Sequence, residues 1–332
     1  MFKDKTILIS GGTGSWGHEI TRQLLTKEVK EIIIFSRGEN AQVEMQRKLN
    51  CKLDRYVIGD VRDPDAVNKV MSRGIDYVFH AAALKHVPIC ENYPDEAIKT
   101  NIAGIRNVID AAIKYKVKKF VNISTDKAAG PSNLYGLTKA IAERLTIQAN
   151  CLAMDTEFIN IRTGNVLGSN GSIIPYVIDQ IKTVNKVRIT DRQMMRFFLT
   201  VQQAVELLFY ATKNGIGGET YIRKIPAFYI IDLIELLVEF YGDSNTKIEV
   251  IGIREGEKIN EELITQSEIS RTDDINKDYY VIYPEIKTGR NYNCSWYDIG
   301  GSMLIDKAVI SEDNLQSKEQ LSTLLKQGGW LK

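Results

Sequence analysis

Six short apolar runs, rich in β-branched residues, recur in the first half of the chain, and segments with helical periodicity separate several of them. The runs are "KTILIS" (5–10), "EIIIFS" (31–36), "RYVIGD" (55–60), "DYVFHA" (76–81), "KFVNIS" (119–124) and "TEFINI" (156–161). Helical periodicity is clearest over 94–116 and 133–150. Apolar strands that alternate with helices are typical of a parallel sheet covered on both faces. The pattern predicts an α/β protein with a doubly wound parallel sheet.

The alternation weakens after Ile161, and 332 residues suit one large domain or two joined lobes. We therefore predict a Rossmann-like domain over residues 1–163 and a smaller C-terminal substrate-binding lobe over 164–332, with some segments returning to the first domain. Two polar stretches are predicted to be mobile loops, residues 265–277 and "KTGRNYNCSWYDIGGS" (287–302).

Composition excludes several classes of partner. The 43 basic residues nearly balance the 42 acidic ones, so bulk charge indicates neither a nucleic-acid nor a membrane-surface partner. The four cysteines have no metal-ligand or disulfide spacing, which is typical of reduced thiols. The most apolar stretch, "FYIIDLIELLVEFYG", is interrupted by Asp232, Glu235 and Glu239 and predicts an amphipathic helix. We expect a soluble, cytoplasmic protein without a metal site.

A glycine pattern follows the first predicted strand and opens the next helix. Gly11, Gly14 and Gly17 have G-x-x-G-x-x-G spacing. Glycines let the backbone approach a pyrophosphate, and a helix N-terminus favours its negative charge. After the second strand stand Ser36 and Arg37, where an NAD site usually has an acidic residue. A hydroxyl and a guanidinium suit a 2′-phosphate, so we predict NADP over NAD; the alternative is that Arg37 is a solvated surface residue.

The segment after the fifth strand combines several reactive groups. Ser124 and Thr125 end the strand, and Tyr135 precedes Lys139 by one turn of the next predicted helix. An ammonium near a phenol favours the phenolate, so Tyr135 is a candidate base toward a substrate hydroxyl. YxxxK also occurs by chance in helices, but here it follows a predicted dinucleotide site.

The glycine turn, the serine-threonine strand end and YxxxK together resemble the extended short-chain dehydrogenase/reductase superfamily, which acts mostly on nucleotide sugars. Six further strings resemble the UDP-N-acetylglucosamine (UDP-GlcNAc) 4,6-dehydratases: "GDVRD" (59–63), "HAAALKHVP" (80–88), "IKTNIAGIRNVI" (98–109), "STDKA" (124–128), "GNVLGSNGSIIP" (164–175) and "IGIREGEKINEELI" (251–264). The resemblance covers nearly the whole chain. It is strongest to the type that inverts carbon 5 and begins pseudaminic acid synthesis.

This resemblance implies a catalytic set of Thr125, Asp126, Lys127, Tyr135 and Lys139. Tyr135 would take the proton of the hydroxyl at carbon 4 while hydride passes to NADP⁺. Lys127, with a pKa lowered by burial and by Lys139, would remove the proton at carbon 5, and Asp126 would protonate the departing hydroxyl at carbon 6. Hydride would then return to carbon 6. The alternative is structural, with Asp126 capping a turn and Lys127 solvated.

The resemblance also implies the binding residues. Cofactor contacts are expected from Gly11, Thr13, Gly14, Ser15, Trp16, Gly17, Ser36, Arg37, Asp60, Val61, Ala81, Ala82, Ala83, Tyr135 and Lys139. Substrate contacts are expected from Lys85 at the cleft mouth, from Asn165, Arg196 and Arg254 on the diphosphate, and from Glu257 on the uridine ribose. His86 has no evident partner, and we assign it no role.

Several alternatives remain open on the same scaffold. A C5-retaining dehydratase would share the motifs, and a UDP-sugar 4-epimerase or reductase would use Tyr135 and Lys139 without needing an acid at carbon 6. A non-catalytic NADP-sensing regulator would keep the glycine turn and lose YxxxK. The resemblance further implies a homo-oligomer, a dimer or higher.

Overall fold

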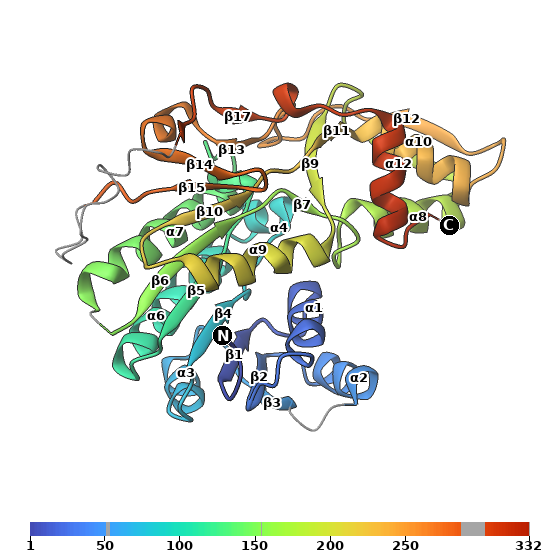
Figure 1. The fold of residues 1–332 in the computed structure, drawn as a ribbon. Helices are drawn as coiled ribbons and strands as arrows, with labels where there is room; N and C mark the ends of the chain where they lie inside the picture. Colours follow the sequence, from blue (N-terminus) through green and yellow to red (C-terminus); the bar gives the residue numbers. More distant parts are fainter. Residues whose placement is uncertain (51–53, 154, 287–302, 332) are drawn as a thin grey trace.

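The structure is a computed structural model that describes residues 1–50, 54–153, 155–286 and 303–331. Within these ranges, ten strands form one central sheet in the order β16-β14-β15-β10-β6-β5-β4-β1-β2-β3. Neighbours from β10 to β3 run parallel, and β14, β15 and β16 add an antiparallel extension. Figure 1 shows helices on both sides of this sheet. The α/β, Rossmann-like class predicted from the hydrophobic pattern is confirmed.

The six strands predicted from the apolar runs all form, each within two residues of its expected bounds. The parallel strands are β1 (Thr6–Ser10), β2 (Glu31–Ser36), β3 (Asp54–Ile58), β4 (Tyr77–His80), β5 (Lys119–Ile123), β6 (Glu157–Arg162) and β10 (Thr220–Arg223). Side chains alternate between two cores: Ile7 and Ile9 of β1 pack on one face, and Leu8 packs on the other. Burial on both faces explains why these strands are apolar throughout.

Two groups of helices cover the sheet. One core receives α1 (Ser15–Leu24), α2 (Glu39–Leu49) and α9 (Val201–Asn214), and the other receives α3 (Pro64–Met71), α6 (Gly104–Lys114) and α7 (Leu134–Leu152). Shorter helices α4 (Val87–Asn92) and α5 (Pro94–Ile98) precede α6. The helix predicted over 133–150 is confirmed as α7.

The helix predicted over 94–116 is continuous only in part. Between α5 and α6 the backbone forms a π-helical turn, η1 (Lys99–Ala103). Within it Asn101 accepts a hydrogen bond from Leu84 N and donates to Leu84 O and to Thr138 Oγ1, at 2.8, 2.9 and 3.0 Å. A π turn is wider than an α turn, and such turns are common at functional sites. Here it coincides with the point where Asn101 ties the segment after β4 to helix α7.

The prediction of a mobile loop over residues 265–277 is wrong. It contains the 3₁₀ helix η3 (Gln266–Arg271) and strand β14 (Thr272–Asn276), which pairs with β15 (Tyr279–Ile282) and β16 (Met303–Leu304). Thr265 and Glu268 form a capping box at the start of η3. The polar side chains therefore serve internal contacts. The other predicted loop, 287–302, lies outside the described residues, as do Cys51 and Cys294.

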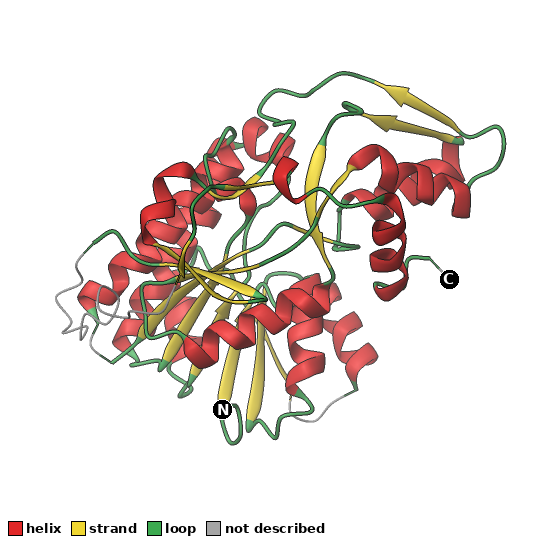
Figure 2. Cartoon of the chain, turned by 45° about the horizontal axis from the view of Figure 1, so that its top comes forward, coloured by secondary structure: helices red, strands yellow, loops and turns green. Residues whose placement is uncertain are grey.

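The remaining elements gather at the carboxyl end of the parallel strands, as Figure 2 shows from a second direction. They are β7 (Asn165–Val166), α8 (Ile173–Val184), β8 (Lys186–Ile189), β9 (Met195–Leu199), β11 (Ala227–Tyr229), α10 (Ile230–Tyr241), β12 (Lys247–Val250), β13 (Glu262–Ile264), β17 (Val309–Ile310), α12 (Lys318–Gln327) and the short 3₁₀ turns η2 (Asp126–Ala128) and η4 (Glu312–Asn314). The predicted amphipathic helix is α10, which buries Ile230, Leu233, Ile234 and Leu237. In the described ranges, no helix is long and apolar enough to cross a membrane. The domain boundary at 163/164 stays a prediction.

Candidate active site

A cavity of about 700 Å³ lies where the turns after β1 to β6 meet the loop over residues 163–173. Most predicted site residues line it: Gly11, Thr13, Gly14, Ser15, Trp16, Ser36, Arg37, Asp60, Val61, Ala81, Ala82, Ala83, Lys85, Thr125, Lys127, Tyr135, Lys139 and Asn165. Parallel strands deliver their carboxyl ends to one edge, so residues far apart in the sequence converge there.

The glycine turn after β1 is packed so closely that side chains do not fit at two of its positions. Gly11 has φ +67°, and a Cβ there would lie 2.7 Å from the backbone of Ala82. A Cβ on Gly17 would lie 1.9 Å from Gly12 O, so this glycine lets α1 pack against the turn and does not itself line the cavity. The N-terminus of α1 consequently borders the cavity, which suits an anionic group.

The turn after β2 holds a hydroxyl and a guanidinium. Ser36 Oγ accepts a hydrogen bond from Gln42 Nε2 at 3.0 Å. Arg37, half-exposed, lies 3.8 Å from the carboxylate of Asp60. Asp60 is bound more closely by Arg62, at 2.6 Å. Burial opposes the charge on Asp60, but the Arg62 bonds outweigh it and lower the pKa of that carboxyl. The Arg37 guanidinium thus lines the cavity, and its contact with Asp60 is longer than that of Arg62.

Helix α7 brings Tyr135 and Lys139 to the cavity. Asn133 caps the helix by accepting from Gly136 N, and Lys139 Nζ donates to Ile123 O at 2.7 Å. Burial lowers the pKa of Lys139 to about 8, although Glu143 opposes this. Burial also raises the pKa of Tyr135 to about 12, against the charge of Lys127 and a hydrogen bond with Thr125. We predicted that Lys139 favours the phenolate, but the ammonium that does so is Lys127.

Asp126 and Lys127 lie in η2, directly after β5. The Asp126 side chain is fully buried, and its Oδ1 lies 3.1 Å from Lys127 Nζ and accepts from Thr125 Oγ1 at 2.9 Å. Thr125 caps the turn, and the Lys127 side chain is 19% exposed and lines the cavity. The alternative in which Asp126 is a cap and Lys127 is solvated is therefore wrong.

A third charged group at this position, Glu261, was not predicted from the sequence. Its Oε1 lies 3.3 Å from Lys127 Nζ. Burial would lower the pKa of Lys127, but the carboxylates of Asp126 and Glu261 outweigh burial and raise it. This contradicts the predicted lowering by burial and Lys139. "REGEKINEELI" contains four acidic residues, and nothing in the string indicates which of them turns inward.

The predicted substrate contacts divide into two groups. Asn165 lines the cavity with its Oδ1 3.5 Å from Lys127 Nζ, and Lys85 Nζ lies 3.5 Å from Ser169 Oγ. Arg196 is buried outside the lining residues, and donates to the carbonyls of Met195 and Ile259.

Arg254 and Glu257 also lie outside the cavity lining. Their side chains are 49% and 23% exposed and lie 3.9 Å apart. The contacts predicted for Arg196, Arg254 and Glu257 with a uridine diphosphate stay predictions.

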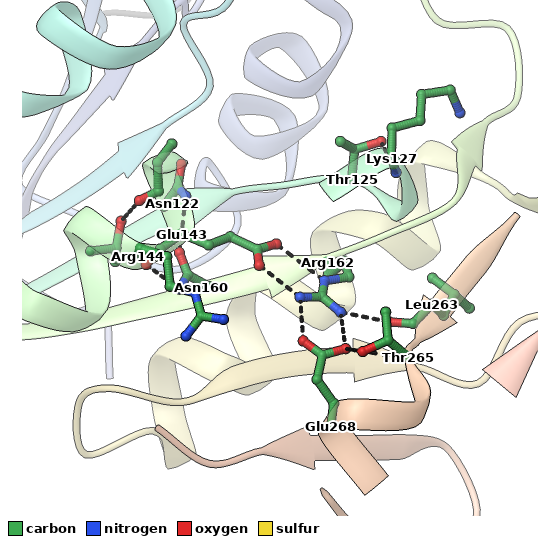
Figure 3. Close-up of polar contacts among 12 residues, drawn as sticks. Asn122, Thr125, Lys127, Glu143, Arg144, Asn160, Arg162, Leu263, Thr265 and Glu268 are labelled. Carbon is green, nitrogen blue, oxygen red and sulfur yellow. Dashed lines mark hydrogen bonds and ion pairs between the residues drawn. The ribbon is translucent and has the colours of Figure 1, made fainter. Parts of the chain in front are cut away.

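A buried ion cluster ties helix α7 to strand β6 and to η3. Arg162 on β6 donates to Glu143 on α7 at 3.1 and 2.7 Å and to Glu268 in η3 at 2.9 Å twice, as drawn in Figure 3. A fifth bond reaches Leu263 O at 2.9 Å. The cluster joins α7, one turn beyond Lys139, to the segment that follows Glu261. The sequence offered no signal for it, because its members come from three separate segments.

Comparison with known proteins places the chain in a family. A family model described as "Polysaccharide biosynthesis protein" matches residues 7–283. An uncharacterized membrane protein of Methanocaldococcus jannaschii is 43% identical over 319 residues, covering 94% of this chain and 95% of its own. A protein named UDP-glucose 4-epimerase from Rickettsia akari is 42% identical over 319 residues, covering 94% and 91%.

Solved structures agree on the fold. Pen from Bacillus thuringiensis superposes with a TM-score of 0.92 at 41% identity, with both chains fully covered. The dTDP-glucose 4,6-dehydratase DesIV from Streptomyces venezuelae has a TM-score of 0.70 at 20% identity, covering 76% of this chain and 86% of its own. The chain belongs to the polysaccharide biosynthesis protein family and has the fold of the extended short-chain dehydrogenases/reductases.

Proposed function

We propose that this protein is an NADP-dependent UDP-GlcNAc 4,6-dehydratase. The observation that carries the proposal is the Asp126–Lys127 pair beside Tyr135: a buried carboxyl and an amine, 3.1 Å apart, at the cavity end of β5. An enzyme that only oxidises and reduces carbon 4 needs the phenol but neither an acid nor a base for carbons 5 and 6. The pair therefore favours elimination of water after the oxidation.

The cavity residues fit a dinucleotide. The glycine turn has no side chains at Gly11 and Gly14, so a pyrophosphate can approach its backbone and the N-terminus of α1. Ser36 and Arg37 suit a 2′-phosphate. Bound there, NADP⁺ would accept hydride from carbon 4 and later supply it to carbon 6. Lys139, anchored on Ile123 O, would face the ribose of the nicotinamide.

Three side chains of this protein, Tyr135, Lys127 and Asp126, each carry out one proton transfer. Tyr135 takes the proton of the hydroxyl at carbon 4, helped by the charge of Lys127. The resulting ketone acidifies the hydrogen at carbon 5, which Lys127 removes, while Asp126 protonates the hydroxyl leaving carbon 6. We propose inversion at carbon 5, which would give UDP-2-acetamido-2,6-dideoxy-β-L-arabino-hexos-4-ulose; retention is the alternative.

A UDP-sugar 4-epimerase is the second candidate, because the Rickettsia relative carries the name UDP-glucose 4-epimerase. Incubation with UDP-GlcNAc in D₂O, followed by NMR, separates the two. A 6-deoxy-4-keto product with deuterium at carbon 5 supports the dehydratase, and its coupling constants give the configuration. A product epimerised at carbon 4, with carbon 6 still hydroxylated, refutes it.

A variant tests the assignment of Lys127. Lys127→Ala is expected to bind NADP but to release no deuterated product, because the base for carbon 5 is missing. Lys116→Ala, which removes an exposed lysine paired with Asp155, is the control and should turn over normally. Unchanged turnover in Lys127→Ala would remove this lysine from the mechanism.

A further inference from the structure

Four charged side chains from three segments form one buried cluster, in which Lys127 lines the cavity while Asp126, Arg196 and Glu261 lie outside its lining. Asp126 and Lys127 come from η2, Arg196 from β9, and Glu261 from the segment just before β13. Their side chains are 0%, 19%, 7% and 5% exposed, respectively. Glu261 Oε1 serves both cations, at 3.3 Å from Lys127 Nζ and 3.5 Å from Arg196 Nε. Tyr135 on α7 and Asn165 on β7 also face Lys127.

The cluster has no net charge when all four groups are ionised, since two carboxylates balance two cations. Moving one proton from Lys127 to Asp126 leaves Glu261 and Arg196 as a single ion pair, so the net charge is again zero. Net charge in a buried site is costly, whereas this transfer creates none. Its path is short, because Lys127 Nζ and Asp126 Oδ1 already lie within hydrogen-bond distance.

The two carboxyl oxygens of Asp126 differ in their hydrogen bonds. Oδ1 receives the bonds from Thr125 and Lys127, while Oδ2 is buried and has no hydrogen-bond partner among the described residues. A proton on Asp126 would therefore meet no competing donor at Oδ2 from the part of the chain that the structure describes, since the two donors from Thr125 and Lys127 both lie at Oδ1.

We propose that Glu261, paired with Arg196, is a positioning residue that holds Lys127 against Asp126. In this role it controls the proton transfer from Lys127 to Asp126, which makes Lys127 a base and Asp126 an acid for the dehydration. This rests on the proposed function. In the transfer an N–H bond of Lys127 breaks and an O–H bond forms on Asp126. Lys127 then takes the proton of carbon 5, the electron pair of that bond forms the double bond to carbon 6, and the departing hydroxyl takes the Asp126 proton to become water. Both residues return to their ionised starting states.

The test uses two substitutions with opposite expected effects. Glu261→Gln removes the carboxylate beside Lys127, so the amine loses its proton more readily. In the pH profile of deuterium incorporation at carbon 5, the midpoint of the acidic limb should move about one pH unit lower, which is a tenfold change in proton affinity. Arg196→Gln removes the second cation that pairs with Glu261, so that Glu261 pairs only with Lys127. The midpoint of the acidic limb should then move to higher pH. Glu262→Gln, whose carboxylate lies 3.5 Å from Lys258, is the matched control and should leave the limb unmoved.

A readout independent of turnover separates this inference from the proposed function. Reductive ¹³C-methylation lets NMR follow the titration of Lys127, which should move downward in Glu261→Gln and stay in place in Glu262→Gln. A uniform loss of rate in Glu261→Gln with an unmoved limb and unmoved titration would show a structural role alone and overturn the proposal. If the titration moves but the wild-type protein forms no 6-deoxy-4-keto product, the proposed function fails, and with it the acid-base role of the cluster.

Discussion

The buried Glu143–Arg162–Glu268 cluster permits a quantitative prediction, tested by the substitution Glu268→Gln. Burial would raise the pKa of Glu268, but the charge and hydrogen bonds of Arg162, with smaller contributions from Thr265, lower it to about 2. Each tenfold change in proton affinity is worth about 1.4 kcal/mol. Relative to an ordinary glutamate, with a pKa of about 4.3, the ionised side chain therefore stabilises the folded state by about 3 kcal/mol at neutral pH. The substituted amide would keep the shape of the side chain and lose most of this stabilisation.

The stabilisation by Glu268 depends on pH in a direction that follows from its lowered pKa. Because the folded-state pKa is depressed, the stabilisation is complete above about pH 4.3 and is lost as the pH falls toward 2. Urea unfolding, followed by circular dichroism, should show Glu268→Gln less stable by about 3 kcal/mol at pH 7, with this deficit reduced to roughly half at pH 3.

Glu285→Gln is the matched control for this experiment. Glu285 also pairs with two arginines, Arg144 and Arg271, but its side chain is 44% exposed. Exposed pairs contribute about 1 kcal/mol or less. Equal losses in the two variants, or a Glu268→Gln deficit that does not narrow between pH 7 and pH 3, would refute the assignment of this stability to a buried ion cluster.

Two further predictions concern the cavity, and a third concerns the glycine turn beside it. Tyr135→Phe should lower kcat by about 10²-fold or more while leaving NADP affinity intact, because only the proton acceptor is lost; NMR turnover and calorimetry check this, and near-normal kcat contradicts it. Arg37→Ala should weaken NADP binding about tenfold and leave NAD binding nearly unchanged; an equal loss for both cofactors would remove Arg37 from the 2′-phosphate site. Gly17→Ala should cost about 1–3 kcal/mol in urea unfolding, because its Cβ meets Gly12 O, whereas Gly38→Ala should cost far less since its Cβ meets only Ala41 at 3.7 Å; similar costs would show that the turn yields.

Features that depend on neighbours along the chain were predictable from the sequence. Residue periodicity predicted the strands and helix α7, and the position of a residue after a strand predicted that it reaches the cavity. The YxxxK spacing likewise places Tyr135 and Lys139 one turn apart in any α-helix. Local rules failed at Asn101, where a π turn replaces a regular helical turn.

Features that depend on partners from distant segments appeared only in the folded molecule. The stretch 265–277 looked like a loop because its polar residues suggest solvent, yet Glu268 is buried against Arg162. Burial was expected to lower the pKa of Lys127, but the carboxylates of Asp126 and of Glu261, which the fold brings from a distant segment, together raise it. Charge interactions act through space and strengthen as water is excluded. The residue types and their places after the strands therefore predicted most of the groups that line the cavity, and tertiary packing decided which charged partners surround Lys127 and so the direction of its pKa shift.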